Sequence, residues 1–163
     1  MNFLTMRSAR IIATLLICLL LPLLIGGISG YATASGIQNW YVTLHKPSFN
    51  PPNYLFGPVW TFLYLIMGIS LFMIWNSGKG KNRTSALTIF IIQLMLNFLW
   101  SFLFFKFQLI GVALLEILLI WISIVWMIMA FNRVNKYAAY IQVPYLLWVS
   151  FAAMLNGAIW LLN

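Results

Sequence analysis

Five long apolar runs, separated by short polar connections, make up most of the chain. They cover about residues 11–30, 54–76, 85–105, 109–131 and 137–162. A helix needs about 20 apolar residues to cross a bilayer, and lipid offers no partner to exposed backbone groups. The pattern therefore predicts an all-α integral membrane protein. We expect one domain over residues 1–163, folded as a bundle of five transmembrane helices.

The first run has a competing interpretation as a signal peptide. Arg7 and Arg10 precede an apolar core, and small residues follow at Ala32-Thr33-Ala34. The core is longer than the ~7–15 residues typical of signal peptides, so we expect a retained helix. A purified protein lacking about 34 N-terminal residues would favour the signal peptide instead.

The longest part that cannot form a plain membrane helix runs from Trp40 to Trp60. It contains four of the six prolines, which are Pro47, Pro51, Pro52 and Pro58. Proline lacks an N–H donor and restricts the backbone, so this segment should form a stiff loop between the first two helices. We predict that it acts as a lid. Pro144 lies inside the fifth run, where we expect a kink.

Composition supports lipid as the main solvent and excludes several kinds of chemistry. Hydrophobic residues make up 64% of the chain and charged residues 6%, against about 25% charged in soluble domains. The formal charge of +8 is spread between apolar runs, which indicates membrane topology rather than nucleic-acid binding. With one Cys, one His and one acidic residue, the chain cannot supply a hydrolytic triad, a carboxylate pair or an ordinary metal site. His45 could ligate a metal or haem iron, but beside Lys46 we expect a solvated side chain.

The basic residues predict the orientation, because cytoplasmic loops are rich in Lys and Arg. Seven of the nine fall on one side, namely Arg7, Arg10, Lys79, Lys81, Arg83, Arg133 and Lys136; Lys46 and Lys106 fall on the other. We expect a cytoplasmic N-terminus, with the proline-rich loop and the C-terminus outside. We expect a bacterial cell membrane; the alternative is the mitochondrial outer membrane.

Polar and aromatic residues gather in the outer half of the predicted bundle. At ~1.5 Å per residue, Trp60, Trp100, Glu116, Asn97 and Asn156 lie ~9 to ~13 Å below the outer surface, and Trp148 ~21 Å. Helical spacing places them on shared faces: Gln93, Asn97, Trp100 and Phe104; Trp60, Tyr64, Gly68 and Leu71; Trp148, Ala152, Leu155 and Asn156. Gln93 also fits a plain interhelical hydrogen bond, and Trp40, Trp75 and Trp160 fit interfacial belts.

Glu116 is the only acidic residue, and an ionisable side chain inside a span is a functional hypothesis by default. It could be protonated, bonded to Asn97 or to an indole N–H, or reached by Lys46. A purely structural contact is an equal alternative. Proton coupling is disfavoured, because the chain has no second acid to relay a proton.

The sequence resembles the TspO/MBR family of tryptophan-rich sensory proteins, which includes the mitochondrial translocator protein, a peripheral-type benzodiazepine receptor. The matching residues run in order from 40 to 156: Trp40-Tyr41, Leu44, Lys46-Pro47-Ser48, Pro51-Pro52, Gly57-Pro58-Val59-Trp60, Leu63-Tyr64, Met67-Gly68, Gln93, Asn97, Trp100, Phe104-Phe105, Ala113, Glu116, Pro144-Tyr145-Leu146, Trp148, Phe151-Ala152 and Leu155-Asn156. Phe49 departs from the family pattern, which often has Trp there. Gly157 and Leu161 also depart, because the family's sterol-recognition pattern needs an aromatic and a base.

The resemblance implies a five-helix bundle, often a homodimer, with a pocket closed by the loop between helices 1 and 2. Family ligands include porphyrins, sterols and benzodiazepine-type compounds. The tryptophans that match Trp60 and Trp148 are linked in the family to porphyrin binding and to the light-dependent breakdown of porphyrins. The residues that match Asn97 and Ala152 belong to the pocket.

Residue spacing and resemblance together lead us to expect a membrane sensor that binds porphyrins such as protoporphyrin IX or haem, with no required cofactor. The expected ligand-binding residues are Trp40, Lys46, Pro51, Pro52, Trp60, Tyr64, Gln93, Asn97, Trp100, Glu116, Trp148, Ala152 and Leu155. The alternatives are a light-dependent porphyrin-degrading enzyme, with Trp60 and Trp148 as catalytic residues, or a transporter of porphyrin or sterol. The absence of paired broken helices and of an inverted repeat argues against a transporter.

Overall fold

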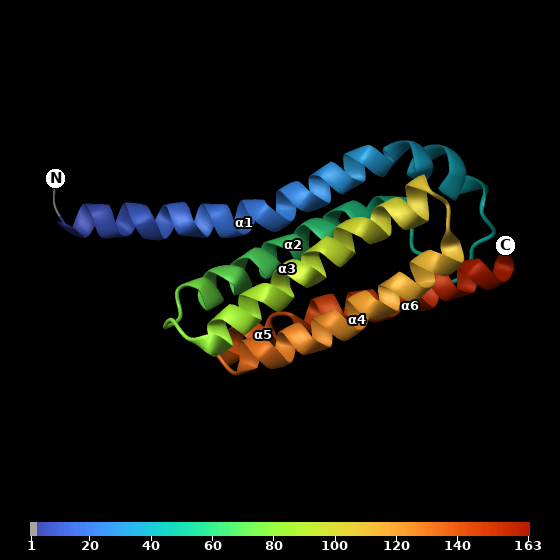
Figure 1. Ribbon diagram of the computed structural model, residues 1–163. Helices are drawn as coiled ribbons and strands as arrows, with labels where there is room; N and C mark the ends of the chain where they lie inside the picture. The colour runs from blue at the N-terminus through green and yellow to red at the C-terminus, as the bar shows by residue number, and fades with distance from the viewer. Residues whose placement is uncertain (1–2) are drawn as a thin grey trace.

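The computed structural model describes residues 3–163, and its regular elements are all helical. In chain order they are α1 (Phe3–Ser35), the π-helical turn η1 (Gly36–Trp40), the 3₁₀ turn η2 (Tyr41–Thr43), α2 (Asn53–Trp75), α3 (Lys81–Ser101), the π-helical turn η3 (Phe102–Lys106), α4 (Ile110–Asn132), α5 (Lys136–Tyr140) and α6 (Val143–Leu162). Figure 1 shows α2, α3, α4 and α6 as a bundle, with α1 along one side and extending beyond it. Five helical segments are long and apolar enough to cross a membrane. The prediction of a five-helix integral membrane protein is confirmed.

The first helix is longer than the predicted 11–30. It begins at Phe3, and helical geometry continues through η1 and η2 to Thr43. Pro22 lies inside α1 without ending it, and Figure 1 shows α1 changing direction about halfway along. Proline removes one backbone hydrogen bond and bends a helix there. The irregular connection before α2 is therefore limited to residues 44–52.

Close approach of α1 and α2 explains a glycine in the second predicted stripe. A Cβ atom on Gly68 would lie 2.7 Å from Leu19 Cα and 2.8 Å from Cys18 O. Only glycine leaves room for the α1 backbone at this point. Cys18 is buried by the same contact.

The fifth span is two helices rather than the single kinked helix expected over 137–162. The chain turns at residues 141–142, and Pro144 lies in the first turn of α6, where a missing N–H costs nothing. Buried Gln142 supports the break, because its Nε2 donates to Ile66 O (3.1 Å) and Ser70 Oγ (2.6 Å). Ser70 Oγ donates in turn to Ala138 O (2.9 Å). The break is therefore bonded directly to α2.

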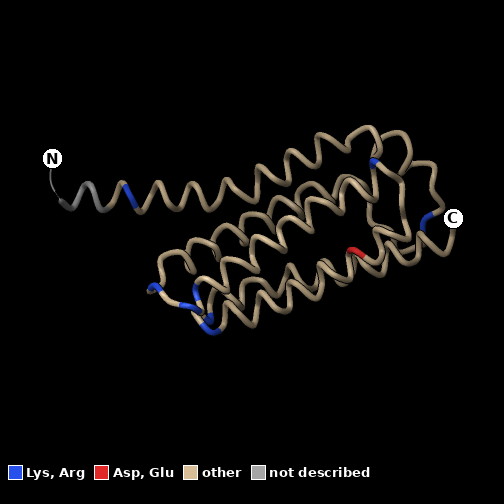
Figure 2. Tube along the Cα trace, in the orientation of Figure 1, with Lys and Arg blue, Asp and Glu red and all other residues tan. Residues whose placement is uncertain are grey.

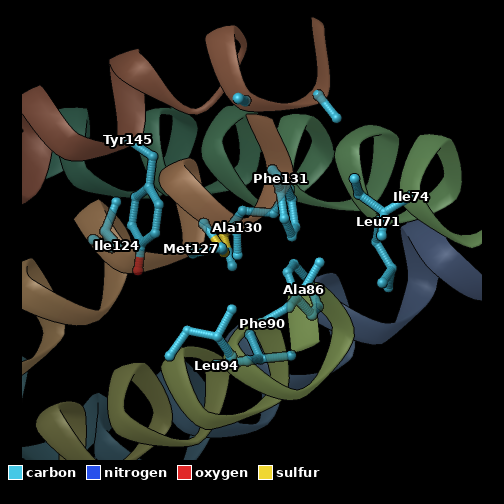
Figure 3. Packing of buried hydrophobic residues seen from close by; sticks show 14 of the residues in the cluster. Leu71, Ile74, Ala86, Phe90, Leu94, Ile124, Met127, Ala130, Phe131 and Tyr145 are labelled. Atoms are coloured by element: carbon cyan, nitrogen blue, oxygen red, sulfur yellow. The ribbon is translucent and has the colours of Figure 1, made fainter. Parts of the chain in front are cut away.

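The end of the bundle that holds α5 is tightly packed. Figure 3 shows Phe90 of α3 beside Phe131 of α4, and their rings stack with centroids 6.2 Å apart. Phe90, Phe131 and Met127 are fully buried. Apolar side chains fill the space between the helices here.

The basic residues gather at the same end. Blue positions of Figure 2 cluster where α2 is followed by α3 and α4 by α5. Lys79 and Arg133 lie in these connections, and Lys81, Arg83 and Lys136 in the first turns of α3 and α5. Figure 2 shows further blue positions at the opposite end, where Lys46 belongs to the connection 44–52 and Lys106 to the last turn of η3. The bundle is therefore strongly asymmetric in charge along its axis.

Candidate functional site: an aromatic cavity near the connection 44–52

A cavity of about 370 Å³ lies between α1, α2, α3 with η3, and α6. Its size is within the range of small-molecule sites. Its lining residues are mostly aromatic, aliphatic or small: Leu23, Gly26, Gly27, Ser29, Gly30, Thr33, Ile37, Tyr41, Asn53, Phe56, Gly57, Trp60, Thr61, Tyr64, Asn97, Trp100, Ser101, Phe104, Phe105, Trp148, Ala152, Leu155, Asn156 and Ile159.

Three tryptophans from three helices form the walls of this aromatic cavity. Trp60 stacks on Tyr64 with ring centroids 5.5 Å apart, and Trp100 stacks on Phe104 at 5.1 Å. Trp148 meets Phe56 edge to face at 6.0 Å and packs against Phe151 at 5.6 Å. Paired rings hold one another in fixed orientations, and each pair contributes ~1 kcal/mol beyond area burial. The cavity therefore has stiff, planar walls.

Asn97 holds the inner part of the cavity together. Its Oδ1 accepts a hydrogen bond from Tyr64 OH (2.8 Å), and its Nδ2 donates to Tyr145 OH (3.0 Å). Gln93 Nε2 also donates to Tyr145 OH. Asn97 thus joins α2, α3 and α6, and it orients the ring on which Trp60 stacks. Gln93 is buried behind this network and does not line the cavity.

Asn156 plays the same part for a second wall. Its Oδ1 accepts from Trp100 Nε1 (3.4 Å), and its Nδ2 donates to Ile110 O (3.1 Å). The side-chain amides of Asn97 and Asn156 thus both help to fix aromatic walls. Few polar groups are therefore left for a ligand, and the cavity favours apolar faces over polar ones.

Hydroxyl groups on α1 and α2 leave the remaining wall effectively apolar. Ser29, Thr33 and Thr61 each donate to a backbone carbonyl of their own helix, at 3.0, 2.7 and 2.9 Å. Gly27 and Gly30 face open space, since a Cβ atom there would meet nothing within 4 Å. The α1 side of the cavity is thus shaped by missing side chains.

The structure brings together seven of the predicted ligand-binding residues. Those that line the aromatic cavity are Trp60, Tyr64, Asn97, Trp100, Trp148, Ala152 and Leu155. Six others do not line it: Trp40, Lys46, Pro51, Pro52, Gln93 and Glu116. The spacing on the helices located the wall residues well, because aromatic and amide side chains shared faces. Their role in ligand binding stays a prediction.

Glu116 is buried in α4, with 6% of its surface exposed. Among the described residues, neither carboxyl oxygen has a hydrogen-bond partner. The Asn97 side chain is bonded to two tyrosines, and Lys46 Nζ donates to Val42 O (3.4 Å) and Leu44 O (3.2 Å). Two of the partners considered from the sequence, Asn97 and Lys46, are therefore engaged elsewhere, whereas the indole N–H of Trp148 is buried without a partner in the described part of the chain.

The connection 44–52 is fixed at three points to the end of the bundle opposite α5. Tyr41 OH donates to Asn50 Oδ1 (2.8 Å), and Phe49 packs edge to face on Phe151 at 6.3 Å. Asn163 Oδ1 accepts from His45 N, and Asn163 Nδ2 donates to His45 O, both at 3.0 Å. Tyr41 lines the aromatic cavity, whereas residues 44–52 do not. The connection therefore touches the cavity through Tyr41.

Sequence reasoning missed the contribution of α1. Gly26, Gly30, Thr33 and Ile37 line the cavity at spacings of four, three and four residues, which place them on one helix face. That spacing was a usable signal. It was obscured because the surrounding residues are uniformly apolar, as expected of a helix in lipid.

The helices and the cavity define a class: an integral membrane protein with an aromatic cavity between its helices. Comparison with known proteins makes this specific. The model of the TspO/MBR family matches residues 18–161, and the chain belongs to that family.

Three relatives illustrate the range of the family. The "Tryptophan-rich protein TspO" of Chlorobaculum tepidum is 45% identical over 153 residues, covering 93% of this chain and 97% of the relative. The "Translocator protein" of Bos taurus is 39% identical over 145 residues, covering 86% and 85%. The "Tryptophan-rich sensory protein" of Cereibacter sphaeroides is 33% identical over 120 residues, covering 73% of each chain.

The Asn97 network makes a prediction about stability. Tyr64→Phe removes the O–H donor and leaves the buried Asn97 Oδ1 unpaired, which should cost about 1–3 kcal/mol of unfolding free energy. The thermal unfolding of the detergent-solubilised protein measures this cost. Tyr31→Phe is the matched control, because Tyr31 is 89% exposed. Equal stability of the two variants would contradict the structural role of Asn97.

Proposed function

We propose that the protein is a membrane-embedded binding protein or sensor for porphyrins and related flat hydrophobic ligands. The observation that carries the proposal is the aromatic cavity, in which Trp60, Trp100 and Trp148 from three helices surround one space of about 370 Å³. A porphyrin has two broad apolar faces, and indole rings stack on such faces. The small residues of α1 leave room for a flat molecule.

The edge of a porphyrin carries carboxylates, which need a cation or hydrogen-bond donors. Lys46 and His45 are the candidates close in sequence to the cavity-lining Tyr41, and Lys46 Nζ lies 4.8 Å from the centre of the Tyr41 ring. In this proposal the carboxylates point toward the connection 44–52. Lys46 would exchange its bonds to backbone carbonyls for a charged partner.

The names of the relatives bear on the alternatives. "Tryptophan-rich sensory protein" favours sensing, and "Translocator protein" names a transport function for the bovine relative. An enzyme is the third possibility, in which Trp60 or Trp148 donates an electron or hydrogen to a light-excited porphyrin. Ring stacking in the cavity would place either indole against the porphyrin, so binding alone does not separate these functions.

Titration with protoporphyrin IX tests the binding proposal. We expect saturable quenching of tryptophan fluorescence, with weaker binding to Trp60→Phe and Trp148→Phe because each loses part of a planar wall. Trp75→Phe is the control, since Trp75 lies at the other end of α2 and outside the cavity. Absence of saturable quenching would refute the porphyrin-binding cavity.

Parallel titrations in darkness and under light separate the functions. A porphyrin product that forms only under light, and only with Trp60 and Trp148 intact, would favour the enzyme. Uptake of porphyrin by liposomes that contain the protein would favour the transporter. Binding with neither product nor uptake supports a sensor.

The connection 44–52 is proposed to act as a lid on the cavity. Its prolines restrict the unfolded chain, so the segment loses little entropy when it becomes ordered. Pro51→Gly combined with Pro52→Gly should therefore weaken protoporphyrin binding while the helical circular dichroism shows that the bundle stays folded. Unaltered affinity in this variant would show that the segment is only a connection.

The charge asymmetry of the bundle supports a cytoplasmic N-terminus, with the aromatic cavity toward the outside. We expect a reporter that is active only in the cytoplasm to be inactive when fused after Asn163 and active when fused within residues 77–80. The reverse pattern would refute this orientation. A homodimer belongs to the same proposal, and light scattering that gave the mass of a single chain would refute it.

A further inference from the structure

A second concave site lies at the opposite end of the bundle from the aromatic cavity. This basic cleft has a volume of about 370 Å³ and is formed by the connections α2–α3 and α4–α5. Four of its lining residues are cationic: Lys79, Lys81, Arg83 and Arg133. The remaining lining residues are small or polar apart from Val134. Two connections far apart in the sequence therefore direct their positive charges into one hollow.

No acidic side chain balances these cations, because Glu116 is the only acid in the chain and lies buried within α4. Arg83 is held in place by Trp75, whose ring centre lies 5.0 Å from Arg83 Cζ. Arg83 Nε is buried and has no hydrogen-bond partner among the described residues. Positive charges that line one hollow repel one another unless an anion from outside the chain lies between them.

The start of α3 adds donors to the same hollow. Its N-cap residue, Gly80, has no side chain to cap the helix, and the first backbone N–H groups of a helix have no partner within it. Backbone N–H groups at a helix start favour anions, especially phosphate. Because Gly80 and Lys81 both line the basic cleft, these donors reinforce the four cations.

A groove continues from the basic cleft along the outside of α3. Lys81 lines both sites, and the rest of the groove is formed by Thr84, Ser85, Thr88, Ile89, Ile92 and Trp126. Its composition changes in order along α3, from a cation through three hydroxyl groups to apolar side chains. Trp126 and Ile92 are 57% and 47% exposed, so this part of the groove faces the lipid.

The dimensions and chemistry of the two sites match one molecule. From Lys81 to Ile92, α3 rises about 16 Å, close to the ~15 Å half-thickness of the hydrocarbon core. We propose that the basic cleft and the adjoining groove together bind one anionic phospholipid. The phosphate lies among the cations, the ester groups face Thr84, Ser85 and Thr88, and an acyl chain follows Ile92 and Trp126.

This proposal does not rest on porphyrin binding, and it differs from the effect of basic loops on topology. Topology depends on the number of cations on each side of the membrane, whatever their arrangement. A lipid site additionally requires that the cations converge and that the groove leads away from them. A soluble phosphate compound would use the basic cleft alone, without the groove.

Native mass spectrometry of the full chain in detergent micelles tests the site. Micelles have no inner or outer leaflet, so topology cannot contribute. Purified protein is titrated with short-chain phosphatidylglycerol or phosphatidylcholine, and bound lipid is counted. We expect selective retention of one phosphatidylglycerol, and about 30-fold weaker retention when Lys81→Gln and Arg133→Gln are combined, at ~1 kcal/mol per lost cation.

Two further variants separate the possible outcomes. Lys106→Gln removes a cation at the opposite end and should leave lipid retention unchanged. Thr88→Trp fills the groove without changing charge and should abolish retention while the melting temperature is maintained. Equal loss in the Lys106→Gln protein would overturn the proposal, as would undiminished retention in the Thr88→Trp protein. Binding of inorganic phosphate without retention of phosphatidylglycerol would overturn the proposal and assign the basic cleft to a soluble ligand. A changed oligomeric mass of Thr88→Trp with unaltered lipid retention would also overturn it and assign the groove to a second copy of the chain.

Discussion

The amide of Asn97 is the single group on which the arrangement of the bundle most depends. It accepts from Tyr64 OH and donates to Tyr145 OH, so one side chain of α3 fixes both α2 and α6. In an apolar interior an unpaired amide or hydroxyl group costs more than a paired one contributes. Sliding or rotation of any of these helices would break at least one bond. Apolar packing alone, which tolerates many arrangements, would not give this precision.

That fixed point divides the bundle into two parts with different properties. Toward α5, side chains such as Phe90 and Phe131 fill the space between helices. Toward the connection 44–52, planar aromatic walls surround a cavity that α1 completes with small residues. The polar network at the boundary keeps Tyr64 and its neighbour Trp60 in place. A packed half thus provides the rigid support that an open half requires.

The sequence predicted the number of helices because lipid imposes a minimum length on every span and requires internal hydrogen bonding. It also predicted the faces of α2, α3 and α6, where aromatic and amide residues recur at helical spacing. We predicted that Pro144 lies inside one kinked helix, but the structure has a complete break before it. Hydrogen bonds from Gln142 to Ile66 and Ser70 of α2 stabilise this break, and these partners are distant in the sequence. The positions of Glu116 and Lys46 likewise depend on contacts with other parts of the chain, which the spacing of residues along one helix does not predict. The depth of a residue along a transmembrane helix follows from the sequence. The direction in which its side chain points depends on contacts with neighbouring helices.

The pair of hydrogen bonds between Asn163 and His45 joins positions 118 residues apart. Ribosomes add about 5–20 residues per second, so His45 is made on the order of ten seconds before its partner. Throughout that interval the connection 44–52 lacks its attachment to α6, and the wall that carries Trp148 does not yet exist. The cavity is therefore completed only after α6 and Asn163 have been made. A nascent chain cannot enclose a hydrophobic ligand in the completed cavity before α6 has entered the membrane.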